Sequence, residues 1–183
     1  MADRSNCSSV NLYFQDESRF GLKTHLGSCI CARGVQAIVP YQHKFQNTYL
    51  YGAYSPVDGE SYTWEMPSVN KEIFIRYLNS FAAHRAEEFK IIVIDNAAFH
   101  STLDVQLPPN ICLLRIPPYT PELNPCEQIW REIKKRFKRQ IFKTLDKLKE
   151  WLYQKVNELE PETIKSITSN HHYRDAFFAT FNR

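Results

Sequence analysis

The sequence predicts an α/β fold: a mixed five-stranded sheet of three antiparallel and then two parallel strands, flanked by helices. Three observations lead to this prediction. Segments with alternating polarity or many aromatic residues, typical of strands, occupy the first third of the chain. Two mainly apolar runs, at 90–95 and 111–116, are typical of strands covered on both faces, as in a parallel sheet. Apolar residues at helical spacing follow them, so helices are expected to cover the sheet.

The first strand is predicted at 9–16, where polar and apolar side chains alternate. Val10, Leu12, Phe14 and Asp16 share one face of this segment. We expect Asp16 to end the strand.

A β-hairpin is predicted next, with strands at 48–54 and 61–66 that are rich in Tyr, Thr and Trp. The Pro-Val-Asp-Gly segment at 56–59 is a turn signal between them. Residues 17–47 contain turn glycines and show no clear period, so we expect them to be irregular.

A first helix is predicted after Ser68, whose side chain is suited to cap it. Ile73, Tyr77 and Phe81 then recur at four-residue steps, which is the spacing of one helix face.

Two longer helices and a short one are predicted in the last third of the chain. The first has an apolar stripe at steps of three and four residues: Leu123, Cys126, Trp130, Ile133 and Phe137. The second begins near Thr144 and ends at Pro161, and the short one is expected at 162–168.

Length and composition fit one folded domain at 1–183, with a core at about 9–160 and C-terminal helices at 144–183. The chain is 43% hydrophobic with 5 glycines, which excludes a disordered or collagen-like protein. Its 5 cysteines include no C-x-x-C pair, so free thiols are expected and a zinc site is disfavoured. No apolar run approaches the ~20 residues of a membrane span, and we expect no membrane partner.

The basic charge is concentrated in one block. Residues 131–149 hold nine Lys or Arg and two acids, whereas the whole chain has a net charge of only +3. Such a block is typical of a surface that binds a polyanion, although a solvated helix face is an equally good interpretation.

Three acids lie where α/β sheets usually place their chemistry, at or beyond strand ends. Asp16 and Asp95 follow the first and fourth predicted strands, and Glu127 lies in the first turn of the helix after the fifth. If the first and fourth strands are neighbours, the three carboxylates converge. Their mutual repulsion would be relieved by a divalent cation, and hard oxygen ligands suit Mg²⁺ or Mn²⁺.

Each acid also has a structural interpretation. Asp16 could simply end a strand, and Asp95 before Asn96 could form an Asx-turn. The Asn-Pro-Cys-Glu segment at 124–127 fits a capping box, with Asn at the N-cap and Glu at N3. These interpretations do not explain why all three acids occupy positions compatible with one cluster.

Three motifs follow one another in an order that is characteristic of a known family. They are Gln-Asp-Glu-Ser at 15–18, Val-Ile-Asp-Asn-Ala-Ala-Phe-His at 93–100, and Pro-Tyr-Thr-Pro-Glu-Leu-Asn-Pro-Cys-Glu-Gln-Ile-Trp at 118–130. With these motifs the chain resembles the catalytic domain of DDE transposases of the mariner superfamily, in particular the bacterial insertion-sequence 630 family. The resemblance covers about 9–160.

The resemblance implies an RNase H-like fold and DNA strand cleavage and strand transfer that depend on two Mg²⁺ or Mn²⁺ ions. It assigns the catalytic, metal-binding triad to Asp16, Asp95 and Glu127, with Asp16 bridging both ions. The 31 residues between Asp95 and Glu127 are slightly fewer than the family usually has, so the intervening loop is expected to be trimmed.

The resemblance also implies partners and a location. The substrate would be the DNA of transposon ends, and the target most often a TA dinucleotide. Family members carry a helix-turn-helix region before the first catalytic strand. Only eight residues precede Ser9, so we expect that region to be absent. The chain could then be the second half of a split transposase, whose partner is a separate helix-turn-helix polypeptide, or a truncated copy, or one domain expressed alone. Mariner relatives act as dimers, so a homodimer is a candidate state, and a prokaryotic cytoplasm, near the nucleoid, is the expected location.

Several neighbouring residues have two interpretations. Asn96 could orient a metal-bound water or serve a turn, and His100 could contact a phosphate, relay a proton or be a satisfied loop histidine. The basic residues that could neutralise DNA phosphates, some of which must instead be ordinary solvated surface, are Lys134, Lys135, Arg136, Lys138 and Arg139.

Two other functions remain open on the sequence. The chain could be a non-catalytic or decayed copy that serves as a DNA-binding accessory module through its basic block. It could also be another RNase H-like nuclease that acts on RNA–DNA hybrids or junctions. Metal-dependent DNA cleavage separates the first from a transposase, and the choice between hybrid and duplex substrates separates the second.

Overall fold

The computed structural model describes most of the chain, namely residues 3–24, 30–36, 38, 41–97, 100, 106–138 and 140–181. Its centre is a five-stranded sheet in the order β3-β2-β1-β4-β5. The strands are β1 (Ser9–Gly21), β2 (Asn47–Tyr54), β3 (Ser61–Met66), β4 (Glu88–Ile94) and β5 (Ile111–Arg115).

The sheet is mixed, as predicted. The strands β1, β2 and β3 pair antiparallel, and β4 and β5 run parallel to β1 on its other side. The expected proximity of the first and fourth strands is therefore confirmed. All seven residues of β4 are buried, in agreement with its mainly apolar sequence.

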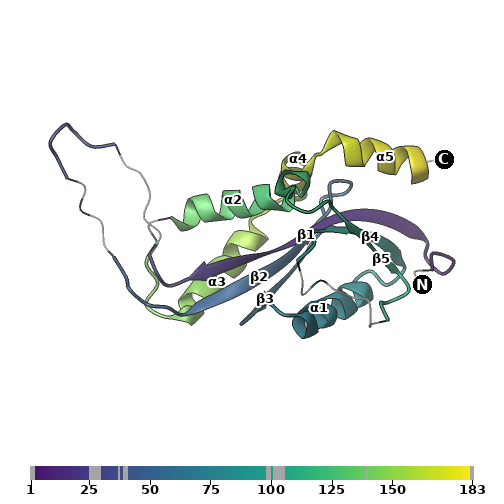
Figure 1. The fold of residues 1–183 in the computed structure, drawn as a ribbon, viewed down its shortest axis with the longest axis horizontal. Helices are drawn as coiled ribbons and strands as arrows, with labels where there is room; N and C mark the ends of the chain where they lie inside the picture. The colour runs from purple at the N-terminus through teal and green to yellow at the C-terminus, as the bar shows by residue number, and fades with distance from the viewer. Residues whose placement is uncertain are drawn as a thin grey trace.

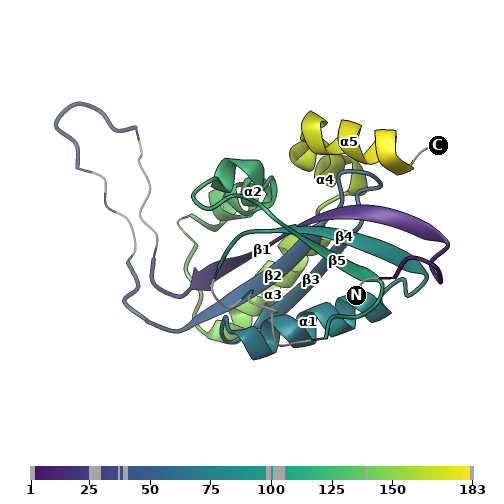
Figure 2. The same cartoon turned by 45° about the vertical axis from the view of Figure 1, so that its right-hand side comes forward.

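The two faces of the sheet are covered by different helices (Figures 1 and 2). The helix α1 (Lys71–Ala83) covers one face, where Phe74, Tyr77 and Phe81 share an apolar core with Tyr13 of β1, whose ring contacts that of Phe81. The opposite face carries the rest, namely α2 (Cys126–Phe137), α3 (Leu145–Asn157), α4 (Pro161–Thr168) and α5 (His171–Phe181). Alternate residues of β1 thus belong to two separate apolar cores, one on each side of the sheet.

The first strand is longer than predicted. β1 continues through Asp16 to Gly21, because residues 14–21 pair with β2 in an unbroken antiparallel register. The alternation of apolar residues does not predict this extension, because residues 15–19 are polar. Gln15 and Ser18 are nevertheless fully or almost fully buried. Asp16 therefore lies within the strand instead of ending it.

Helix boundaries also differ from the predictions. Leu123 belongs to a short 3-10 helix, Pro121–Leu123, and α2 begins only at Cys126. Pro161 does not end α3, which stops at Asn157, and instead begins α4 because proline suits the first turn of a helix. The predicted helix start near Thr144 is confirmed, and the Thr144 side chain caps α3 by accepting a hydrogen bond from the Lys147 backbone N–H.

The cap of α1 is Asn70 and not the predicted Ser68. The Asn70 side chain accepts a hydrogen bond of 2.9 Å from the Ile73 N–H. Replacement of Asn70 by Ala is expected to lower the free energy of unfolding by about 1 kcal/mol, because one helix-end donor loses its partner. Urea denaturation measures this loss. The matched variant Ser68→Ala should change stability by less than about 0.5 kcal/mol, and an equal loss in both variants would restore Ser68 as the cap.

A buried polar cluster fixes the start of the parallel β1–β4 pair. Glu88 accepts hydrogen bonds from the Tyr13 hydroxyl at 2.8 Å and from the Asn11 amide at 3.2 Å, so both strands are joined through its carboxylate. The Lys90 ammonium, whose side chain is fully buried, donates to the Arg85 carbonyl at 2.8 Å. A shift in the pairing of β1 and β4 would leave these buried polar groups without hydrogen-bond partners, which is costly. The cluster therefore fixes the register of the two strands, and with it the relative position of their C-terminal ends.

Within the residues that the structure describes, no helix is long and apolar enough to cross a membrane.

Candidate active site

Two of the predicted acids lie at the same level on neighbouring parallel strands. The register of β1 and β4 runs from Ser9 opposite Glu88 to Phe14 opposite Val93. Asp16 and Asp95 each lie two residues beyond the last of these pairs. The alternation along β1 directs Asp16 to the face that α2 covers, whereas Asp95 lies just beyond the end of β4.

Asp16 is largely buried beneath α2. The indole N–H of Trp130 donates a hydrogen bond of 2.9 Å to Asp16 Oδ2. Burial raises the pKa of Asp16 to about 7, helped by the negative charges of Glu17 and Glu127 and opposed by the Trp130 hydrogen bond. Burial and the neighbouring negative charges both disfavour ionisation of the Asp16 carboxyl. A bound cation would stabilise its ionised form.

A glycine makes room for the Trp130 ring. Gly52 of β2 lies directly opposite Asp16 in the antiparallel register. A Cβ added to Gly52 would lie 2.8 Å from Trp130 Cη2 and 2.6 Å from Tyr54 Cε2, closer than real contacts allow. The absence of a side chain at Gly52 is therefore needed for the indole to reach Asp16.

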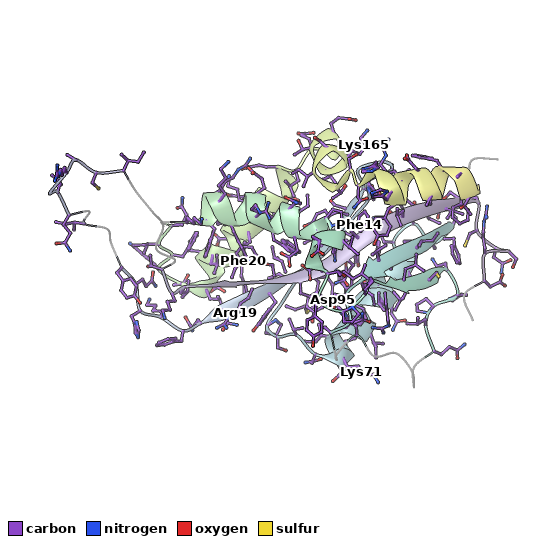
Figure 3. The ribbon with its side chains drawn as sticks, turned by 45° about the horizontal axis from the view of Figure 1, so that its top comes forward. Phe14, Arg19, Phe20, Lys71, Asp95 and Lys165 are labelled. Atoms are coloured by element: carbon purple, nitrogen blue, oxygen red, sulfur yellow. The ribbon has the colours of Figure 1, made fainter. Side chains whose placement is uncertain are left out.

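Asp95 directly follows β4 and is about half exposed (Figure 3). Its Oδ1 accepts a hydrogen bond of 2.9 Å from the Ala97 N–H, which is the Asx-turn interaction. The same oxygen lies 2.7 Å from His100 Nδ1. The hydrogen bond from His100 holds the pKa of Asp95 below its usual value.

His100 joins two acids from opposite sides of its ring. Nδ1 contacts Asp95, and Nε2 lies 3.2 Å from Oε1 of Glu17, whose side chain is only 7% exposed. Burial alone would lower the pKa of His100, but the hydrogen bonds to Asp95 and Glu17 outweigh it and raise the pKa to about 9. The ring also packs at 4.3 Å between centroids against Phe74 of α1.

Glu17 is a site residue that sequence reasoning missed. It lies on the opposite strand face from Asp16, and only the fold shows that His100 links it to Asp95. The signal in the sequence was the adjacent pair of acids at 16–17, which alternation directs to both faces of β1.

Glu127 lies exposed in the first turn of α2. The predicted capping box is wrong, because Pro125 is the N-cap and Glu127 is the second helical residue. Asn124 has a different role: its amide donates to the Gln15 carbonyl at 2.9 Å, and its Oδ1 accepts from the Cys126 N–H at 3.1 Å. Asn124 thereby ties the start of α2 to β1 beside Asp16.

The donor set suits a hard divalent cation, because Asp16, Asp95 and Glu127 offer only carboxylate oxygens. The raised pKa of Asp16, caused by burial and by the negative charges of Glu17 and Glu127, indicates a site that favours positive charge. Within the described ranges, however, no three His, Cys, Asp or Glu side chains are already grouped as metal ligands. In this structure one oxygen of Asp95 is held by His100 and Ala97.

Of the other residues predicted to serve the site, Asn96 and Arg136 contact other groups of the protein, whereas the lysines are exposed. The Asn96 amide donates to the Ile116 carbonyl, which links the end of β4 to the residue after β5. Arg136 contacts Glu132 at 3.2 Å and Glu158 at 3.4 Å. Lys134, Lys135 and Lys138 are exposed on or just after α2, and Arg139 lies outside the described residues.

Known protein structures show the same fold. The Mos1 Strand Transfer Complex aligns with 86% of this chain at a TM-score of 0.67 and 16% identity. The mariner Mos1 paired end complex with Mg aligns with 93% at a TM-score of 0.66 and 16% identity. The chain spans about half of each Mos1 chain, 50% and 55% respectively. The predicted RNase H-like fold is thus confirmed.

Sequence comparisons lead to the family. Protein y4pE/y4sA of Sinorhizobium fredii (strain NBRC 101917 / NGR234), itself uncharacterized, is 29% identical over 100 residues, which are 54% of this chain and 74% of that protein. The family described as DDE superfamily endonuclease matches residues 11–149, which include the long motif before α2 and all three acids. This match covers most of the chain, and the chain therefore belongs to the DDE superfamily endonuclease family.

Proposed function

We propose that this chain is the catalytic domain of a transposase, which cleaves DNA phosphodiesters and transfers the cut strand with Asp16, Asp95 and Glu127 as its catalytic acids. One observation carries the proposal: the parallel pairing of β1 with β4 brings Asp16 of β1 level with Asp95, which directly follows β4, in a chain of the DDE endonuclease family. The influence of Glu127 on the pKa of Asp16 supports its inclusion as the third acid.

The three acids would hold two Mg²⁺ or Mn²⁺ ions. When bound, such ions supply activation of an attacking oxygen and stabilisation of the leaving oxygen in phosphoryl transfer. Two similar structures, described as the Mos1 mariner paired end complex with Mn and the mariner Mos1 paired end complex with Mg, support the choice of metals.

The residues around the acids would act by holding them in place. Trp130 fixes one oxygen of Asp16 by a hydrogen bond and shields that carboxyl from water. Asn124 anchors the helix that carries Glu127 to the strand that carries Asp16. His100 contacts Asp95 through one ring nitrogen and Glu17 through the other. In its protonated form it donates a hydrogen bond to each acid, so it can keep Asp95 oriented while DNA and metal are absent.

DNA is the proposed substrate because of the family and of the protein–DNA assemblies solved for Mos1, which include the Mos1 transposase paired-end complex with left transposon end. The TA target, a separate helix-turn-helix polypeptide, a homodimer and a cytoplasmic, nucleoid-associated location stay predictions.

A DNA-binding accessory module is the second candidate. It is favoured by the engagement of Asp95 with His100 and Ala97, which leaves the acids ungrouped in the residues the structure describes. Such a module would bind DNA without divalent ions and would not cleave it.

Nicking of a supercoiled plasmid in Mn²⁺ tests the proposal, since it needs no knowledge of the transposon-end sequence. The transposase domain should convert plasmid to the nicked form in Mn²⁺ and not in EDTA, and each single substitution of a catalytic acid should stop it. Activity that persists without Asp95 would contradict the proposal. Preference for an RNA–DNA hybrid over duplex DNA would indicate the other RNase H-like nuclease.

Replacement of His100 by Gln is expected to lower Mn²⁺-dependent nicking by about 10- to 100-fold, because Asp95 loses the partner that orients it. The half-saturating Mn²⁺ concentration should rise as well, which a purely structural defect would not cause. His84→Gln is the matched control, since His84 also contacts a glutamate, Glu60 at 2.9 Å, but belongs to the end of α1. Unchanged nicking activity in the His100→Gln variant would show that His100 does not orient Asp95 for catalysis.

A further inference from the structure

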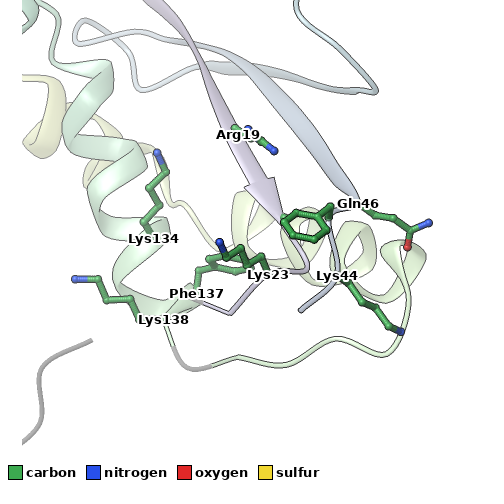
Figure 4. Close-up of a pocket in the computed structure, with 9 residues that line it drawn as sticks. Arg19, Lys23, Lys44, Gln46, Lys134, Phe137 and Lys138 are labelled. Atoms are coloured by element: carbon green, nitrogen blue, oxygen red, sulfur yellow. The ribbon is translucent and has the colours of Figure 1, made fainter. Parts of the chain in front are cut away.

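A basic groove lies where β1 and α2 end, near the chain that leads into β2 (Figure 4). Its volume is about 660 Å³. The groove is lined by five cationic side chains drawn from three separate segments, namely Arg19, Lys23, Lys44, Lys134 and Lys138. We call this surface the basic groove.

The cations of the basic groove are not neutralised locally. Among the residues that the structure describes, no acid lines the basic groove. None of its five cations forms an ion pair with another described residue. Arg19 donates to the Asn47 side chain at 3.1 Å and Lys44 to the Lys143 carbonyl at 2.8 Å, which orient these cations without cancelling their charge. Five converging positive charges favour a ligand with several negative charges along its length.

Aromatic rings are interleaved with these cations. Phe45 is 67% exposed, and the Lys23 ammonium lies 5.8 Å from its ring centroid. The Lys134 ammonium lies 5.8 Å from the Phe20 centroid. Phe45 is the exposed ring here, since Phe20 is only 1% exposed. An exposed aromatic ring beside cations is the combination that binds unpaired nucleic acid, because a base stacks on the ring while phosphates meet the charges.

The helix α2 connects the basic groove to the proposed active site. Glu127 lies in its first turn, and Lys138 is the residue at its end. Lys138 follows Glu127 by eleven positions, which corresponds to about 16 Å along a helix axis. This is the length of about five phosphates of one DNA strand.

We propose that the basic groove binds single-stranded DNA, with phosphates on its five cations and a base stacked on Phe45. A volume of about 660 Å³ suits a few nucleotides of one strand. Given the proposed function, the bound strand is the continuation of the DNA strand that is cut at the acids. This last link rests on the proposed function, whereas the binding itself does not.

Binding is measured with fluorescein-labelled oligothymidylate in EDTA, by anisotropy at increasing salt concentrations. Since no divalent ion is present, the result is independent of cleavage. Five phosphate contacts predict a slope of log affinity against log salt of about −3.5. A duplex of the same length and label should bind more weakly.

The double variant Lys23→Gln/Lys138→Gln removes two cations from the basic groove and should reduce the slope to about −2.1. At about 0.1 M salt its affinity should fall about 25-fold, since each phosphate contact releases about 0.7 of a counterion and so contributes a factor of about five. Lys135→Gln is the matched control, because Lys135 is exposed on the same helix but does not line the basic groove. Phe45→Ala should lower affinity about tenfold, whereas Tyr153→Ala, which removes an equally exposed ring on α3, should not.

Two results would overturn the inference. One is an equal loss of affinity in Lys135→Gln and in the double variant, which would mean diffuse attraction to a basic surface. The other is tighter binding of duplex than of oligothymidylate. Either result combined with normal Mn²⁺-dependent nicking would leave the proposed function intact, whereas normal groove binding without nicking would defeat the proposed function alone.

Discussion

Replacement of Asp16 by Asn is expected to reduce Mn²⁺-dependent plasmid nicking by about a thousandfold, or about 4 kcal/mol of transition-state stabilisation. The amide has the same shape and keeps an oxygen that can accept the Trp130 hydrogen bond, so the fold should be retained. It carries no negative charge, and it therefore cannot serve as a metal ligand of the required kind.

The same substitution should stabilise the metal-free protein. Burial, together with the charges of Glu17 and Glu127, raises the pKa of Asp16 to about 7, so its ionised form is costly in the folded state. The uncharged amide of the Asp16→Asn variant has no such cost, and the melting temperature in EDTA should rise above that of the wild type. Mn²⁺ should then raise the melting temperature of the wild type but not of the variant, because only the wild type binds the ion.

Plasmid nicking and thermal melting with and without Mn²⁺ measure these effects. Glu132→Gln provides the matched control, since it removes a carboxylate of α2 that pairs with Arg136. That variant should cleave at the wild-type rate. An Asp16→Asn protein that nicks as fast as the wild type, or that melts at a lower temperature in EDTA, would contradict this account of Asp16.

Replacement of Trp130 by Ala is expected to lower the free energy of unfolding by about 3–5 kcal/mol, the usual cost of deleting a buried aromatic side chain. The Trp130 side chain is 1% exposed and meets the Tyr54 ring edge-on at 5.7 Å between centroids. It fills the space that Gly52 leaves open on β2. Loss of the indole would leave a cavity between α2 and the sheet.

Urea denaturation measures this loss, with Trp151→Ala as the control because Trp151 is only partly buried on α3. The control should lose clearly less stability. Trp130→Phe separates the two roles of the indole: it should keep most of the stability but lower nicking, since phenylalanine cannot donate to Asp16. Full nicking activity in Trp130→Phe would show that the hydrogen bond does not position Asp16.

Much of the fold could be predicted from local pattern. The apolar run of β4 is buried on both faces, and the aromatic hairpin of β2 and β3 pairs as expected. The full length of β1 could not be predicted, because Glu17 and Arg19 interrupt the apolar pattern while their backbone pairs with β2. A strand that carries functional groups includes polar residues, and such a strand cannot be identified from alternating hydrophobicity.

The sequence also indicated the candidate acids but not their surroundings. Asp16, Asp95 and Glu127 were identified by their positions relative to predicted elements and by family resemblance. The His100 contact with Glu17 depends on chain segments 83 residues apart, and no spacing rule reports it. The basic groove likewise needs Arg19, Lys44 and Lys134 to meet from three segments, and only two of its five cations belong to the basic block at 131–149.

The central claim is that Asp16, Asp95 and Glu127 together hold the divalent ions that support DNA cleavage. Anomalous diffraction from crystals of the protein grown with Mn²⁺ tests this claim most directly. We predict manganese peaks coordinated by the carboxylates of all three residues. Manganese bound elsewhere, or bound without one of these three acids, in a protein that still nicks DNA would contradict it.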